Sequence, residues 1–143
     1  MCNITNEIYE MQRGVASLKK VISNYGEHIG VLESVWDSIP ALMFYKDAQN
    51  NLIKVNRFFC TILKGNKEDF EGRSINELMK DQVQAGKYAM NDLIVIKSGK
   101  AKINIIEKLF DSEITVRTDK FPVQVDDKVV GVLGFSVILE NNG

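Results

Sequence analysis

Apolar residues recur at alternating steps of four and three along the first 39 residues, and this regularity limits the possible folds more than any other sequence feature. The pattern is a heptad repeat, which predicts an α-helix with one continuous apolar stripe. β-branched residues predominate at the a positions, and they favour a parallel pair of helices. The apolar positions are Ile4, Ile8, Met11, Val15, Leu18, Ile22, Tyr25, Ile29, Leu32, Trp36 and Ile39.

We therefore expect residues 1–38 to form an amphipathic coiled-coil helix that makes a homodimer with a second copy. Three glycines within the helix, Gly14, Gly26 and Gly30, weaken it by roughly 1 kcal/mol each relative to alanine. The alternative is a single amphipathic helix that lies on its own domain. The residues expected at the dimer seam are Ile8, Met11, Val15, Leu18, Ile22, Tyr25, Ile29, Leu32 and Trp36.

Composition narrows the class of protein. The chain has 143 residues and a net charge of −1. This nearly neutral charge gives no basic surface for nucleic acid or anionic membranes, so we expect no direct contact with either. No apolar run has the length of a membrane span, and the N-terminal residues lack the order of a signal peptide. The two cysteines are too few for a disulfide framework. These features favour a cytoplasmic location.

A second domain is expected over residues 39–140, because Pro40 disfavours a helical conformation at Ile39 and so ends the first helix. Asn56 is a suitable N-cap for a short helix, and Gly65 follows that helix. The final strand contains Gly131 and Gly134, which indicate either a bulge or close approach by a neighbouring group or a ligand. The sequence predicts strands near residues 42–45, 52–55, 102–110, 113–120 and 128–140, short helices near 57–64, 68–72 and 75–79, and a longer helix at 84–97.

Three segments in this order resemble the PAS domain, a sensory fold of bacterial signal transduction. They are SIPALMFYKDAQNNLIKVNRFFCTILKGNKEDFEGRSINEL, NDLIVIKSGKA and RTDKFPVQVDDKVVGVLGFSVI, and the resemblance covers about residues 36–139. It implies an α+β fold, with a five-stranded antiparallel sheet, short helices on one face and a long helix before it. Family members often close with an Asp-Ile-Thr-like segment. This sequence ends VILENNG, so coupling through the N-terminal helix is expected.

The resemblance also implies a function. We expect a cytoplasmic sensory and dimerisation module, as in two-component systems, which senses a small molecule and regulates an attached or associated output. The output would be a histidine kinase, a cyclic-dinucleotide enzyme or a transcription regulator. The alternative is a ligand-free protein–protein interaction module whose core is filled by its own side chains.

PAS sheets and helices often enclose a small-ligand cavity, and the residue pattern offers candidates to line one. Each of them taken singly also suits an ordinary core position, and Asp92 also suits a local structural hydrogen bond. The candidates are Met43, Tyr45, Phe59, Ile62, Leu63, Tyr88, Asp92, Leu93, Ile96, Ile103, Ile105, Val116, Thr118, Val132 and Ser136.

Catalytic and cofactor signatures are not found in the sequence. His28 is the one histidine and lies in the heptad region, far along the chain from the second domain. No Ser-His-Asp or Cys-His set is therefore expected. PAS domains that hold haem usually place a histidine on the long helix, and residues 84–97 have none. Cys60 lies outside the motif of flavin-binding relatives. We expect no enzyme activity, no metal, no haem and no flavin, and an unidentified small molecule as any ligand.

The heptad seam generates a first prediction. Replacing Ile22 and Ile29 together with lysine places charges in the apolar seam, so the double variant should be a folded monomer where the wild type is a dimer. Light scattering measures the mass, and circular dichroism checks the fold. A double variant that remains dimeric would place the dimer interface outside the helix.

Overall fold

A computed structural model describes residues 3–139 of the chain. These residues divide into two compact units, with the boundary between Val35 and Trp36. Of the two predicted domains, residues 1, 2 and 140 lie outside the described range. None of the helices within residues 3–139 is both long and apolar enough to cross a bilayer.

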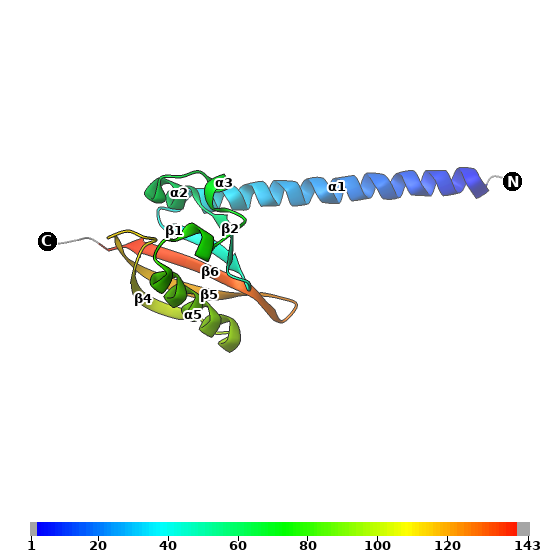
Figure 1. The fold of residues 1–143 in the computed structure, drawn as a ribbon. Coiled ribbons are helices and arrows are strands. Elements are labelled where there is room, and N and C mark those ends of the chain that lie inside the picture. The colour runs from blue at the N-terminus through cyan, green and yellow to red at the C-terminus, as the bar shows by residue number, and fades with distance from the viewer. Residues whose placement is uncertain (1–2, 140–143) are drawn as a thin grey trace. The chain divides into compact units, whose positions relative to one another are not determined.

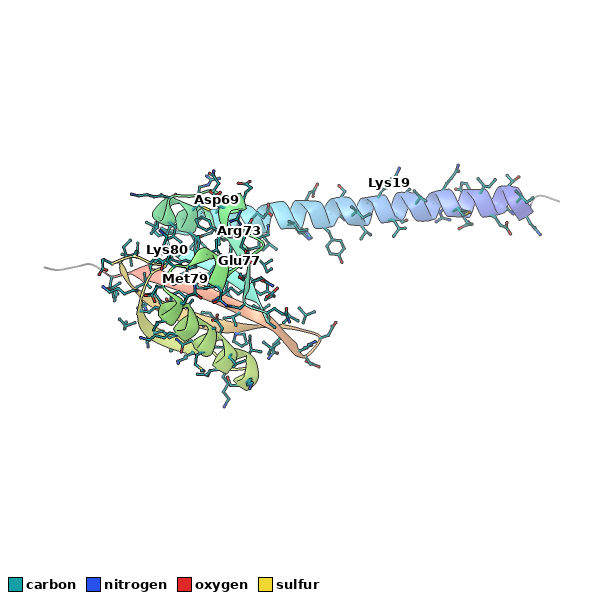
Figure 2. The ribbon with its side chains drawn as sticks, in the orientation of Figure 1. Lys19, Asp69, Arg73, Glu77, Met79 and Lys80 are labelled. Atoms are coloured by element: carbon teal, nitrogen blue, oxygen red, sulfur yellow. The ribbon has the colours of Figure 1, made fainter. Side chains whose placement is uncertain are left out.

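The first unit consists of helix α1 (Asn3–Ser38), whose last three residues belong to the second unit. The predicted long helix is therefore present as one continuous element. None of its residues is buried, and the seam positions Ile22 and Ile29 are 68% and 55% exposed. Side chains project along its length, with Lys19 labelled in Figure 2. The apolar stripe is thus accessible, and the dimer remains a prediction.

The second unit is built on an antiparallel sheet (Figure 1). Within residues 3–139 the sheet has six strands in the order β3-β2-β1-β6-β5-β4, where five were expected. The additional strand is β3, two residues long, which pairs with Asn51 and Leu52 of β2. So short a segment gives no alternation to recognise in the sequence. The strands are β1 (Leu42–Asp47), β2 (Asn51–Val55), β3 (Arg73–Ser74), β4 (Lys102–Lys108), β5 (Thr115–Val125) and β6 (Lys128–Ile138).

Between Trp36 and Leu139, four helices that follow α1 pack on one face of the sheet, as expected for this fold. Asn56 caps α2 by accepting a hydrogen bond from the Phe59 amide at 3.0 Å. Gly99, with a positive φ of 65°, ends the longest of them. Arg73, Glu77 and Met79 lie in the segment that leads from α3 through α4 toward this longest helix (Figure 2). The helices are α2 (Arg57–Leu63), α3 (Lys67–Phe70), α4 (Ile75–Leu78) and α5 (Gln82–Ser98).

Aromatic packing fills much of the space between sheet and helices. The ring of Phe59 makes edge-to-face contacts with Phe44, Phe70 and Phe110 at centroid distances of 6.2, 5.2 and 5.8 Å. Gly134 lies opposite Phe44 on the neighbouring strand. A Cβ atom at Gly134 would lie 2.1 Å from the Phe44 ring, so the ring can rest on β6 only because this residue is glycine.

Asn56 joins the end of α1, the start of β1 and the start of α2. Its side-chain amide donates to the carbonyl of Ala41 at 2.8 Å and also reaches the carbonyls of Trp36 and Ile39. Its side-chain oxygen accepts from the amides of Met43 and Phe59. Since Asn56 is fully buried, no water can replace these bonds if the side chain is removed.

The second prediction tests this junction. Asn56→Ala should lower the free energy of unfolding by about 3 kcal/mol or more, because several buried backbone groups lose their partner. Ser74→Ala is the matched control, since Ser74 caps α4 through one hydrogen bond to Glu77, and it should cost about 1 kcal/mol. Urea denaturation measures both values. Equal losses in the two variants would show that Asn56 acts only as a helix cap.

Candidate functional site

Strand alternation directs two lysines into the interior of the second unit. On β1, every second residue, Leu42, Phe44 and Lys46, faces the helices. On β5, the buried residues Val116, Thr118 and Lys120 are likewise every second residue. On α5 the buried residues Ala85, Tyr88, Asp92 and Val95 follow steps of three and four, which place Asp92 on the face that packs against the sheet. The local patterns therefore bring two ammonium groups and one carboxylate together.

The Asp92 carboxylate is shared by the two lysines. Lys46 Nζ contacts Oδ2, and Lys120 Nζ donates to Oδ1 at 2.6 Å. Lys46, Lys120 and Asp92 are only 2%, 1% and 6% exposed. Lys120 also donates to the Tyr88 carbonyl at 3.4 Å, and its ammonium group lies 5.5 Å from the centre of the Tyr88 ring. We call Lys46, Asp92 and Lys120 the charged triad.

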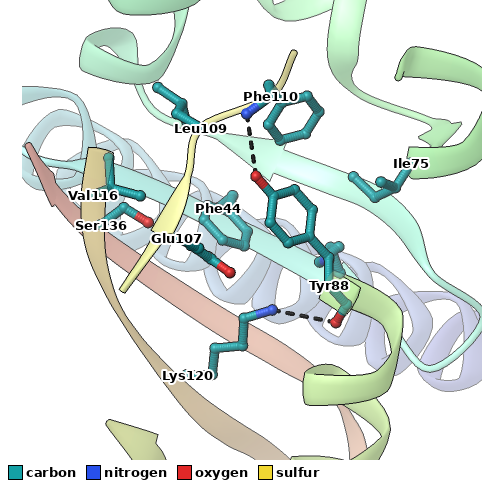
Figure 3. A pocket seen from close by; sticks show the side chains of 10 residues that line it. Phe44, Ile75, Tyr88, Glu107, Leu109, Phe110, Val116, Lys120 and Ser136 are labelled. Atoms are coloured by element: carbon teal, nitrogen blue, oxygen red, sulfur yellow. Dashed lines mark hydrogen bonds between the residues drawn. The ribbon is translucent and has the colours of Figure 1, made fainter. Parts of the chain in front are cut away.

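A small cavity lies beside the charged triad, between the sheet and the helices (Figure 3). Its volume is about 20 Å³, which is room for roughly one water molecule. Tyr88, Glu107 and Lys120 surround it in the close view, with Phe110 and Ser136 at its edges. The residues that line the cavity are Phe44, Lys46, Ile75, Tyr88, Glu107, Leu109, Phe110, Val116, Lys120 and Ser136.

Tyr88 fixes one wall of this cavity. Its hydroxyl donates to the Lys108 carbonyl and accepts from the Phe110 amide at 3.2 Å. Burial raises the pKa of Tyr88 well above its usual value, so the hydroxyl keeps its proton and remains a donor. Asp111 holds the same turn from outside by accepting from the amides of Lys80 and Asp81, each at 2.8 Å.

Burial also changes the ionisable groups that face the cavity. Desolvation lowers the pKa of Lys46, although the neighbouring Asp92 carboxylate opposes that change. Desolvation raises the pKa of Glu107, which is half-buried, although Lys120 opposes it. Both pKa shifts favour the neutral forms of Lys46 and Glu107. A further polar partner in the cavity, or one of opposite charge, would therefore stabilise the ionised form of either side chain.

The cavity lining combines polar and apolar groups. The cavity offers ammonium, hydroxyl and carboxyl groups within an aromatic and aliphatic wall, which is the composition of a small-molecule site. No group of three or more His, Cys, Asp or Glu side chains that could hold a metal ion occurs within residues 3–139. Cys60 is buried and lies outside the cavity lining, and burial raises the pKa of its thiol.

The structure brings together part of the pocket predicted from the sequence. Tyr88, Val116 and Ser136 line the cavity. Phe59, Asp92, Thr118 and Val132 are buried without lining it, and Thr118 shares a 2.7 Å hydrogen bond with Ser136. Ile62 and Leu63 pack against the core from α2.

Other predicted pocket residues lie elsewhere. Met43 and Tyr45 occupy the alternate phase of β1 and point to the opposite face of the sheet, because successive strand residues face opposite sides. Leu93 and Ile96 line a separate hollow between α5 and the turn from β1 to β2. Ile103 is 57% exposed on β4, and Ile105 lines a hollow between β4 and α5.

The charged residues that line the cavity were not predicted from the sequence. Lys46, Lys120 and Glu107 were not selected, because charged residues usually lie at the surface. The alternation Val116, Thr118 continues to Lys120 when extended by two residues. That extension was the signal in the sequence. The contribution of Phe110 depends on the turn held by Tyr88, and no local pattern gives it.

Comparisons with known proteins agree on the fold. A family model described as PAS fold matches residues 36–139. A PAS domain of an HTR-like protein from Haloarcula marismortui aligns with TM-score 0.59 and 19% identity, over 85% of this chain and 99% of that one. A sensory box sensor histidine kinase from Vibrio cholerae aligns with TM-score 0.60 and 14% identity, over 82% and 95%.

A third solved structure is a VqmA–ligand–DNA complex from Vibrio cholerae. It aligns with TM-score 0.64 and 18% identity over 73% of this chain, and the match spans 48% of the VqmA chain, about half its length. At these identities the structural likenesses show the fold alone. No curated protein matches the sequence significantly.

The third prediction concerns the charged triad. Asp92→Asn leaves two buried ammonium groups without a counter-charge, so it should lower the free energy of unfolding by about 3–5 kcal/mol. The triple variant Lys46→Met, Asp92→Leu, Lys120→Met removes all three charges and should be far closer to wild type, since apolar replacement of a buried ion cluster is often neutral.

Glu113→Gln serves as the control, because the Glu113 side chain is exposed and its carboxylate lies 3.9 Å from the Lys108 ammonium group at the surface. It should leave stability nearly unchanged. Thermal and urea unfolding measure all three variants. A triple variant as unstable as Asp92→Asn would show that the triad holds the fold together through its charges.

Proposed function

The chain belongs to the PAS-fold family over residues 36–139, and we propose that it is a sensory module that binds a small molecule beside the charged triad. Its fold is that of sensory domains in signalling proteins. The observation that carries the proposal is the burial of Lys46, Asp92 and Lys120 next to a cavity. A core that served only for stability would gain from apolar residues at these positions, so retained buried charges favour a binding role.

A route for signal transfer supports the proposal. Phe44 and Lys46 line the cavity from β1, and the amide of Met43 on the same strand donates to Asn56. Asn56 in turn holds the carbonyl of Trp36 at the end of α1. A ligand that displaces Lys46 therefore acts on a strand that is tied through one side chain to α1. It shifts the equilibrium only if it binds the two arrangements unequally.

The proposed setting is a cytoplasmic homodimer joined through α1, coupled to a signalling output. Sensor histidine kinases and DNA-binding regulators both occur among the proteins of similar fold. Within residues 3–139, α1 is a long helix with an exposed apolar stripe, and such a stripe can pair with a second helix and so couple the module to its output. Trp36 lies at the junction and reports on it by fluorescence. We assign no catalytic step to the chain.

A second function is favoured by one observation, the small size of the cavity. At about 20 Å³ it holds roughly one water molecule, so the core is nearly filled by its own side chains. A ligand-free interaction module, in which α1 and the sheet recruit partners, would have such a core. The two functions differ in whether a small molecule stabilises the protein.

The fourth prediction separates them. In a thermal-shift screen of small polar metabolites, at least one compound should raise the melting temperature by several degrees, because binding to the folded state alone stabilises it. Val116→Ile adds a methylene group to the cavity wall and should abolish that shift. Val132→Ile is the matched control, since Val132 is equally buried on the same sheet but does not line the cavity.

The control variant should keep the ligand response of the wild type. If no compound shifts the wild-type transition, the ligand-free interaction module is the better description. Absorbance spectra of the freshly purified protein should lack Soret and flavin bands.

A further inference from the structure

The charges around the cavity are unequal in number. Lys46 and Lys120 both pair with the single carboxylate of Asp92. Glu107 faces the same cavity, but no ion pair within residues 3–139 joins it to either lysine. When both lysines are protonated, the charged triad therefore carries one excess positive charge in the interior. An uncompensated buried charge is costly, so an anion that enters the cavity gains from both ammonium groups.

The cavity limits the size of that anion. It holds roughly one water molecule, and its wall is fixed by the Tyr88 hydroxyl and by Asp111 at the turn beyond Phe110. An anion of three or four heavy atoms is larger than one water molecule, so it enters only if the side chains of Lys46, Lys120 and Glu107 move apart. Apart from Lys46 and Lys120, the residues that line the cavity carry no cationic group, so the site offers no third positive charge for a larger polyanion.

The protonation state of Glu107 determines whether the cavity attracts or repels an anion. The groups that face Glu107 are Lys120 and the Thr118 hydroxyl on β5, Lys46 on β1, and Asp92 and Tyr88 on α5. An ionised Glu107 would repel an anion in the same small cavity. A protonated Glu107 would instead donate a hydrogen bond to it. Its burial already raises its pKa, which favours the protonated form.

We propose that the cavity binds a compact monovalent oxyanion, such as nitrate or formate, between the ammonium groups of Lys46 and Lys120, with Glu107 taking up a proton from solvent as the anion enters. This inference rests on the proposed function and names its ligand class. The ion adds two charge-assisted hydrogen bonds and balances the excess charge of the triad.

The test uses the full chain, with sodium nitrate and sodium formate as probes and formamide as the neutral analogue of formate. Two-dimensional amide NMR follows Tyr88, Glu107 and Ser136 at constant ionic strength set by sodium gluconate, whose anion is too large for the cavity. Nitrate and formate should shift these resonances saturably. Formamide should bind about tenfold more weakly or worse, because it lacks the charge.

Paired variants locate the site. Lys120→Met should lower nitrate affinity about tenfold or more through loss of one charge-assisted bond. Lys128→Met, at an exposed position on β6, should leave nitrate affinity unchanged. The comparison of formate with formamide needs only wild-type protein, so it remains decisive if Lys120→Met fails to fold.

The pH dependence tests the role of Glu107. Nitrate does not titrate in water, so any change in its affinity reports on the protein. Between the pKa of Glu107 in the free protein and its higher pKa in the complex, affinity should fall with rising pH, approaching about tenfold per pH unit for one proton taken up. Glu107→Gln should bind nitrate with little pH dependence over that range.

Three outcomes would overturn the inference. Equal binding of formamide and formate would show that charge is not recognised, and a small-molecule sensor would still stand. Absence of any saturable shift with both anions would exclude this ligand class, and the thermal-shift screen would then decide the proposed function separately. A pH dependence that persists in Glu107→Gln would assign the proton to another group.

Discussion

The shared carboxylate of Asp92 is the interaction on which the arrangement of the second unit depends. It joins β1 through Lys46, β5 through Lys120 and α5 through its own backbone, so three elements distant in sequence meet at one ion cluster. Each charge is buried, and each is tolerable only while its partner is in place. The position of α5 on the sheet is therefore specified by charge as well as by packing.

The cavity follows from this cluster. Long side chains on β1 and β5 reach toward α5 rather than fill the space beneath it, and the Tyr88 hydroxyl binds the end of β4 instead of the triad. Gly134 contributes by allowing the Phe44 ring to rest against β6. The space that remains is bordered by charge on one side and by aromatic rings on the other, a combination suited to a small polar ligand.

The second interaction of comparable reach is the side chain of Asn56. It fixes the entry of the chain from α1 into β1 and caps α2 with the same amide group. Asp37 adds to this junction by accepting from the Arg57 amide and pairing with Lys67 at 2.9 Å. The last turn of α1 is thereby tied to the sheet unit, which gives the sensory proposal a mechanical basis.

The sequence alone determined the long helix and the cap at Asn56, because heptad spacing and capping chemistry are local properties of the chain. The antiparallel α+β fold was expected from the resemblance of residues 36–139 to PAS domains. The sequence also provided Tyr88, Val116 and Ser136 of the cavity lining. The tertiary structure decided the rest. On β1 the cavity is lined by Phe44 and Lys46 and not by the predicted Met43 and Tyr45, because those two residues point to the other face of the sheet. The pairing of β4, β5 and β6 brings Lys120 and Glu107 to the same cavity. From sequence alone, a lysine on a strand is expected at the surface. Burial of Lys46 and Lys120 depends on the Asp92 carboxylate of α5, and that ion cluster forms only through contacts between residues far apart in the chain.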